Sequence, residues 1–224
     1  MVKLLKSVYS VFYKEINSEF RNRTSITSVL LFIVITITII SLSIFQEEAS
    51  SGISSGILWL LMFFNSMLGL SKSFISEEER GTSLFLKLHT NSLSVYFGKL
   101  SFNIVFGILY NFLTTVLYIF FNNDIHINSI FLFFTMIIIG SIGLASVSTI
   151  ISAIIARAGN KNAIFPVLSF PVVLPIVIIG VKSLIHCIDG TLLSQIPLDI
   201  VIIVSYTIVI ILLSVILFDY VWKE

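Results

Sequence analysis

The stretch DIVIIVSYTIVIILLSVILFDYV, residues 199–221, carries charge only on the aspartates near its two ends. A helix crosses the ~30 Å hydrocarbon core of a bilayer with about 20 apolar residues, at a rise of roughly 1.5 Å per residue. Five earlier stretches have the same character, at about residues 25–45, 53–72, 98–121, 128–156 and 164–186. The sequence therefore predicts an all-α membrane protein, with six transmembrane helices forming one domain over residues 1–224.

The composition agrees with this prediction, because 57% of the 224 residues are hydrophobic, 11% are charged and the mean hydropathy is +1.07. Soluble domains carry about 25% charged residues, so lipid is the main solvent of this chain. The formal net charge of +1 gives no indication of nucleic-acid binding. The single cysteine, Cys187, cannot form an intramolecular disulfide, and we interpret it as a packing residue.

Basic residues fall on alternate sides of the predicted spans. Twelve of the 13 lie on one side, namely Lys3, Lys6, Lys14, Arg21, Arg23, Lys72, Arg80, Lys87, Lys99, Arg157, Lys161 and Lys223, which leaves only Lys182 on the other. Cytoplasmic loops are enriched in Lys and Arg, so both termini are predicted to be cytoplasmic. We expect no cleavable signal peptide, because the first 24 residues lack a compact apolar core followed by a cleavage site.

Residues 1–24 are predicted to form an amphipathic helix that lies in the inner membrane interface. Apolar residues recur there at steps of three or four, at Leu5, Tyr9, Phe12, Ile16 and Phe20, whereas Lys3, Lys6, Lys14 and Asn17 lie off that stripe. The alternative is a frayed, basic N-terminus.

The largest hydrophilic segment predicted on the cytoplasmic side is residues 73–97. It contains the densest charge in the chain, at Glu77, Glu78, Glu79 and Arg80, followed by Gly81 and Thr82. A water-soluble partner is expected to bind here, whereas the predicted outer loops near 46–52, 122–127 and 187–198 are too short to hold a domain. We expect the acidic residues near a helix start, where the helix dipole favours them, and Gly81 permits a close approach of two backbones or a turn that a Cβ would hinder. The alternative interpretation is an ordinary solvated loop.

The fourth and fifth spans carry packing and breaking signals. Small residues recur at steps of four in the fourth span, at Ser141, Ala145, Thr149 and Ala153, where another helix can approach closely. The fifth span contains Pro166, Pro171 and Pro175, so we expect a kink or local unwinding there. Such a break at Pro171 and Pro175 serves either conformational change or packing alone.

Several kinds of chemistry have no motif in this sequence. Gly98-Lys99 lacks the other P-loop residues, no H-E-x-x-H occurs, and no acidic residue is paired with a histidine inside a predicted span, so an intramembrane enzyme is disfavoured. The spans are expected to lack buried charges, because Asp124, Asp189, Asp199 and Asp219 fall at their ends and can snorkel to water there. This disfavours ion-coupled transport. Ligation of haem or metal by His126 and His186 stays an alternative to solvated or packed histidines. We predict no directly bound cofactor.

The run Ser76-Glu77-Glu78-Glu79-Arg80-Gly81-Thr82, closed by Gly98-Lys99 before the third span, resembles the cytoplasmic loop of permease subunits in type-2 ABC exporters. With Gly56-Ile57-Leu58-Trp59 and Phe170-Pro171-Val172-Val173-Leu174-Pro175, most of the chain is similar to the haem exporter protein B (CcmB) family of the cytochrome c maturation system. The chain departs from that family at Leu84-Phe85 and His89-Thr90-Asn91, where the family tends to have an acidic residue and a proline.

This resemblance implies a permease that binds a cytoplasmic ABC ATPase through Glu77 to Thr82. It also implies a haem-handling membrane subunit with its small helper and a second copy of the chain. ATP hydrolysis by the partner subunit, which binds the ATP, would release a haem-loaded periplasmic chaperone. The complex as a whole would then handle haem. Membrane lipid would surround the chain. The alternative function is export of another cargo, such as a lipid, polysaccharide or drug. The expected location is the bacterial inner membrane, and abundant Ile, Phe, Asn and Ser also fit a mitochondrial genome.

Overall fold

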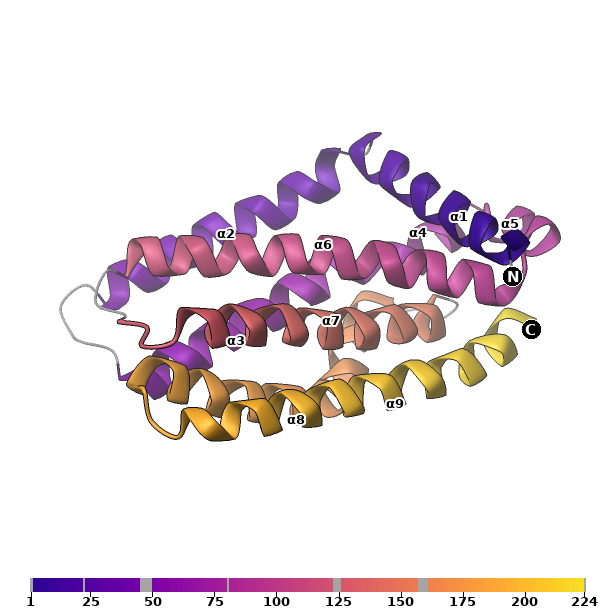
Figure 1. Cartoon of the computed structure of the whole chain (residues 1–224). Coiled ribbons are helices and arrows are strands. Elements are labelled where there is room, and N and C mark those ends of the chain that lie inside the picture. The colour runs from indigo at the N-terminus through magenta and orange to yellow at the C-terminus, as the bar shows by residue number, and fades with distance from the viewer. Residues whose placement is uncertain are drawn as a thin grey trace.

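The computed structural model describes residues 2–21, 23–44, 50–79, 81–122, 126–156 and 161–223. Within these residues the elements are α1 (Val2–Arg21), α2 (Arg23–Ile44), α3 (Ser51–Leu70), α4 (Lys72–Glu79), α5 (Ser83–His89), α6 (Ser92–Phe121), α7 (Ile130–Ile155), α8 (Lys161–Asp189), the 3-10 turn η1 (Leu193–Gln195) and α9 (Ile196–Lys223) (Figure 1). Six described stretches are long and apolar enough to cross a membrane: Ile26–Ile44, Ser51–Glu79, Ser92–Phe121, Ile130–Ile155, Ile164–Asp189 and Leu193–Trp222. The predicted all-α fold with six spans is confirmed.

The helices form an elongated bundle around α7, which packs against α3, α6, α8 and α9. Both termini lie at one end of this bundle together with α4 and α5, and we call it the α4–α5 end (Figure 1). The starts of α3, α7 and α9 lie at the opposite end (Figure 1). Both termini are thus on the same side, as expected for an even number of spans, while the assignment of that side to the cytoplasm stays a prediction.

The small-residue stripe of α7 is a packing surface, as its sequence predicts. Ser141, Ala145, Thr149 and Ala153 are all buried. Buried amides of α6 bind hydroxyl groups on this stripe, because Asn103 Nδ2 donates to Thr149 Oγ1 at 2.8 Å and Asn111 Nδ2 donates to Ser141 Oγ at 3.1 Å. Polar bonds between transmembrane helices contribute about 1 kcal/mol each, so these bonds fix the register of α6 and α7.

Trp59 of α3 packs where α7 and α8 each present a glycine. The Trp59 side chain is 0% exposed. A Cβ added to Gly180 would lie 1.8 Å from Trp59 Cζ2, and one added to Gly140 would lie 2.4 Å from Trp59 Cη2. The indole therefore fills a space that exists only because both facing positions lack a side chain.

The prolines of the fifth span lie inside a continuous helix, since α8 includes Pro166, Pro171 and Pro175. The local unwinding that we expected as one form of the break does not occur, whereas a kink stays a prediction. Pro175 has no amide hydrogen to donate to the preceding turn. In that turn the hydroxyl of Tyr206 in α9 donates to the carbonyl of Val172 at 2.8 Å, so a neighbouring helix stabilises the weakened segment.

Two expectations about polar residues near span ends need correction. Asp199 was expected to reach water, but it is 4% exposed and accepts a hydrogen bond from Ser183 Oγ at 2.7 Å. The predicted absence of buried charge in the spans is also wrong, because Lys99 is 0% exposed. Hydrogen bonds and ion pairs inside the protein replace the solvation that we had expected from snorkelling. Cys187 is buried, as a packing residue should be.

Candidate functional site

Residues 73–97 are mostly helical rather than a loop, because α4, α5 and the start of α6 occupy them. Only a turn at Ser71 separates α4 from α3. Ser152 of α7 holds that turn, since its hydroxyl donates to the carbonyl of Ser71 at 2.6 Å and accepts from the amide of Phe74 at 3.2 Å. The α4–α5 segment is therefore attached to both α3 and α7.

The corner between α4 and α5 is a glycine-ended helix cap. Gly81 has φ +68, the left-handed conformation. The Gly81 amide donates to the carbonyl of Glu78 at 3.2 Å, and the Thr82 amide donates to the carbonyl of Glu77 at 3.0 Å. This pair of bonds defines a Schellman motif. A Cβ on Gly81 would meet no atom within 4 Å, so within this chain the glycine serves the turn and not a close approach.

The acidic run at the end of α4 divides into an inward and an outward part. Glu77 is 6% exposed, whereas Glu78 and Glu79 are exposed. All three occupy the last turn of the helix, where the macrodipole disfavours negative charge. We had placed acidic residues at a helix start, where the dipole favours them, and that placement is wrong. Arg80 lies outside the described residues, and Thr82 is exposed.

Glu77 belongs to a cluster of four charged side chains, Lys14, Glu15, Glu77 and Lys99, which we call the charge cluster. Lys99 Nζ lies 2.9 Å from Glu15 Oε1 and 3.3 Å from Glu77 Oε2. Lys14 Nζ lies 3.2 Å from Glu15 Oε1 and also pairs with Glu77 Oε1. Lys99 Nζ additionally donates to the carbonyl of Ser73. The cluster balances two positive charges with two negative charges.

The two cluster members on α1 have shifted pKa values. For Glu15, burial alone would raise the pKa, but the positive charges of Lys99 and Lys14 outweigh it, and the pKa lies below its ordinary value. For Lys14, burial alone would lower the pKa, but Glu15 and Glu77 outweigh it, and the pKa is raised. Both shifts favour the charged forms, so the ion pairs persist at neutral pH.

α1 reaches this cluster because it packs along α6. Val11 faces Gly98, where an added Cβ would lie 2.7 Å from Val11 Cβ, so the glycine permits the close approach. The apolar stripe predicted for α1 lies on a neighbouring face. Its members Leu5, Tyr9 and Phe20 are exposed, whereas Phe12 and Ile16 pack partly against the core. The helix therefore has one face for α6 and an exposed apolar face, and its location in the membrane interface stays a prediction.

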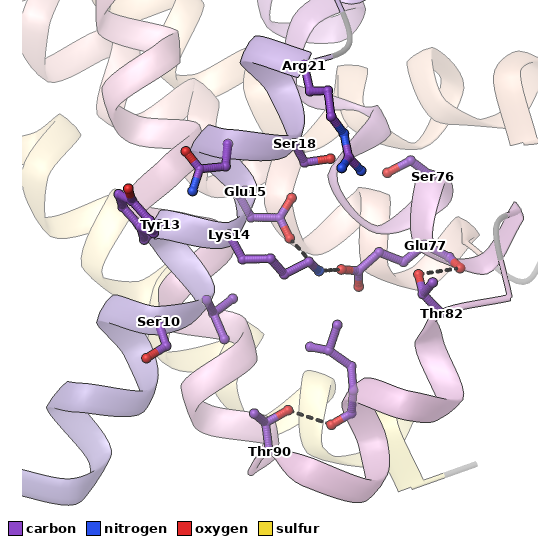
Figure 2. Close-up of a pocket in the computed structure, with 13 residues that line it drawn as sticks. Ser10, Tyr13, Lys14, Glu15, Ser18, Arg21, Ser76, Glu77, Thr82 and Thr90 are labelled. Carbon is purple, nitrogen blue, oxygen red and sulfur yellow. Dashed lines mark hydrogen bonds and ion pairs between the residues drawn. The ribbon is translucent and has the colours of Figure 1, made fainter.

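A cleft of about 780 Å³ separates α1 from α4 and α5, and three members of the charge cluster, Lys14, Glu15 and Glu77, line it (Figure 2). Figure 2 shows Lys14 and Glu77 extending toward each other across the cleft from the two sides, with Arg21 farther along α1. Hydroxyl and amide groups make up most of the remaining polar lining. No described group of three or more His, Cys, Asp or Glu side chains could hold a metal ion.

The structure separates the predicted site residues. Glu77, Glu78, Glu79, Gly81 and Thr82 meet at the α4–α5 end, while Pro171 and Pro175 belong to α8. His126 is exposed, and His186 Nδ1 lies 3.2 Å from Thr191 Oγ1.

Sequence reasoning missed the cluster members Lys14, Glu15 and Lys99. Two signals could have found them. Lys99 follows Gly98 directly at the start of an apolar run, and Glu15 interrupts the side of α1 that carries Val11.

The sequence of the chain matches a known protein family. The model of the CcmB protein family matches residues 6–219, which is nearly the whole chain. No curated protein matches the chain. The family match includes α1 from residue 6 onward, the α4–α5 corner and all six candidate spans except the last residues of α9. The chain belongs to the CcmB family and is a multi-pass membrane protein, the permease subunit of an ABC transporter for cytochrome c maturation.

Proposed function

We propose that this subunit couples ATP hydrolysis by a cytoplasmic ABC ATPase to release of a haem-loaded periplasmic chaperone. The ATPase docks on the α4–α5 corner, and the chain itself binds neither ATP nor haem. One observation supports this site above the others. Glu78 and Glu79 are exposed beside a fixed glycine turn, at the end of the bundle that holds both termini.

The position of these two carboxylates has an energetic cost within the chain. Negative charges in the last turn of a helix are disfavoured by about 0.3–1 kcal/mol each. A basic surface on a partner would compensate this cost and steer the association. The corner is rigid enough for such a contact, because the two Schellman bonds fix the backbone at Gly81.

A displacement of the corner has a direct route into the membrane. α4 continues α3 through the turn at Ser71, and Ser152 ties this turn to α7. α3 in turn carries Trp59 between Gly140 and Gly180. Because these contacts leave little free volume, the helices would move together and transmit the displacement to the opposite end.

The wider assembly follows from the family. We propose a haem-handling membrane subunit with its small helper as neighbours, and a second copy of this chain that faces a second ATPase subunit. With the α4–α5 end in the cytoplasm, α1 lies in the inner leaflet interface of a bacterial inner membrane. The family match gives no support to the alternative of a mitochondrial membrane.

Pro171 and Pro175 are proposed to let α8 bend during this cycle. The hydroxyl of Tyr206 supports the segment between them from α9. Replacing both prolines by Ala should straighten α8 and abolish cytochrome c maturation while the protein still inserts. Full activity of the double variant would remove the mechanistic role. Tyr206→Phe serves as a control that deletes the supporting bond and keeps the prolines.

The docking site is tested by combining Glu78→Lys and Glu79→Lys with Gly81→Trp. We expect loss of the co-purified ATPase and of holo-cytochrome c, with normal amounts of the subunit in the membrane. The loss should be greatest at low ionic strength, because exposed charges are screened over about 10 Å at 0.1 M salt.

Asp189→Lys, which reverses an exposed charge in the last residue of α8, is the matched control and should bind the ATPase normally. If the combined variant binds the ATPase and matures cytochromes, the docking site must lie on α1 or between residues 157 and 161.

A further inference from the structure

The charge cluster connects three helices pairwise. Lys14 and Glu77 join α1 to α4, Lys99 and Glu77 join α6 to α4, and Lys99 and Glu15 join α6 to α1. The bond from Lys99 to the carbonyl of Ser73 adds a second link between α6 and α4. Each of the three helices is therefore held by the other two.

Three of the four cluster members are shielded from a partner at the docking contact, and only Lys14 is exposed. Glu77 and Glu15 are 6% and 8% exposed, and Lys99 is 0% exposed. A partner on the α4–α5 corner would reach Glu78 and Glu79 but not these groups. The three members of the acidic run therefore do not act alike, although they are adjacent in the sequence.

α1 and α4 face each other across a cleft. The cleft of about 780 Å³ lies between them, and Lys14, Glu15 and Glu77 are part of its lining. Figure 2 shows that the pair of Lys14 and Glu77 crosses this space. Ion pairs are directional and specify a single arrangement, whereas an apolar contact of the same area would permit sliding.

We propose that the charge cluster is a clamp that makes α1, α4 and α6 move as one rigid unit, with Glu77 as its central positioning residue. Given the proposed docking of an ATPase on the α4–α5 corner, the clamp passes the displacement of α4 to α1 and α6. The corner then moves three helices and not only α3, its neighbour in the chain.

A pair of variants separates this role from simple stability. Glu77→Leu alone leaves Lys14 and Lys99 with one carboxylate, so a buried positive charge is uncompensated and the yield of folded protein should fall. Adding Lys14→Met restores the balance of one lysine and one glutamate, and the yield should recover. The double variant still lacks the ion pairs from α4 to α1 and to α6. Lys182→Met, which removes an exposed charge from α8, is the control matched to Lys14→Met.

The first measurement uses the full chain in nanodiscs without any partner. Spin labels at Tyr9→Cys on α1 and Glu79→Cys on α4, in a Cys187→Ser background, report the distance between the helices. We expect one narrow distance distribution with the native cluster, and a clearly broader one when Lys14→Met and Glu77→Leu are added. An equally narrow distribution would overturn the clamp.

The second measurement follows the whole system in cells. The double variant should retain the ATPase on co-purification while holo-cytochrome c falls about tenfold, within the range typical of coupling between sites. Normal maturation would overturn the proposal. If the ATPase fails to co-purify even with the native chain, the proposed docking is wrong, and the distance measurement alone decides whether the clamp exists.

Discussion

α3 and α4 are almost one helix, yet their two ends are held by opposite kinds of contact. In α3, Trp59 fills a space between two glycines and is fixed by shape. In α4, Glu77 borders an open cleft and is fixed by two charged neighbours, Lys14 and Lys99. The first contact is sensitive to a single added carbon atom. The second has room beside it but is sensitive to a single unbalanced charge.

This difference follows from the surroundings of each contact. Inside the bilayer, lipid is as apolar as the helices, so association depends on close packing of small residues. At the α4–α5 end the helices carry charge, and burying it requires an opposite charge at short range. We infer that the middle of the bundle sets the packing of the spans, whereas the α4–α5 end sets which helices move together.

The largest expected effect comes from the shape contact. Trp59→Ala should lower the free energy of unfolding by about 4 kcal/mol, because it leaves a cavity of indole size. Gly180→Ala should also destabilise strongly, since its Cβ would overlap the indole ring. Thermal unfolding in detergent measures both. Gly56→Ala on α3 is the control, because its Cβ would meet no atom within 4 Å. A stable Gly180→Ala protein would contradict the tight fit.

The charge contact should respond to pH. Glu15 has a pKa below its ordinary 4.5 in the folded chain. Its stabilisation is therefore complete above the ordinary value and is lost as the pH falls through the lower folded value. Glu15→Gln should lower the free energy of unfolding by about 3 kcal/mol at neutral pH, because Lys99 loses a charged partner. It should also remove the loss of stability that protonation of Glu15 causes in acid.

Unfolding of the Glu15→Gln protein and the native protein is compared at neutral and acidic pH. If the difference in free energy of unfolding between the two proteins is the same at both pH values, the ion pairing of Glu15 is contradicted. The raised pKa of Lys14 does not make the free energy of unfolding depend on pH near neutral pH. Its stabilisation is present below the ordinary 10.5 and is lost only as the pH rises through the higher folded value.

The turn that ends α4 should give a smaller effect. Gly81→Val forces a Cβ into the left-handed region, at a cost of about 1–2 kcal/mol. Gly81→Asn should cost less, because Asn tolerates that region. Thermal unfolding with co-purification of the ATPase provides the comparison. Equal behaviour of the two variants would mean that the turn does not need glycine geometry.

The smallest effect is expected for Cys187→Ser. The serine hydroxyl can donate to a carbonyl one turn earlier, so the cost should stay near about 1 kcal/mol or below. Cytochrome c maturation should be normal. Loss of maturation in a protein that inserts normally would show that the thiol has a chemical role.

The acidic run was predictable as a feature but not as a structure. Its charge density and its place between the second and third spans indicated a binding segment. The sequence could not show that Glu77 turns inward while Glu78 and Glu79 stay outside, because this depends on where Lys14 and Lys99 lie. The two lysines are far from Glu77 in sequence, and only the packing of α1 on α6 brings them near it.

The sequence by itself determined the six spans and the small-residue face of α7, and it offered a turn at Gly81 as one of two alternatives. These depend on local length, periodicity and backbone freedom, which neighbouring residues specify. Only the tertiary structure decided the fit of Trp59 between Gly140 and Gly180, the burial of Lys99 and the division of the acidic run. Contacts between distant helices depend on the relative register of the helices, which the apolar sequence of the spans does not specify. The fit of an aromatic ring against glycine, or the pairing of buried charges, selects one register.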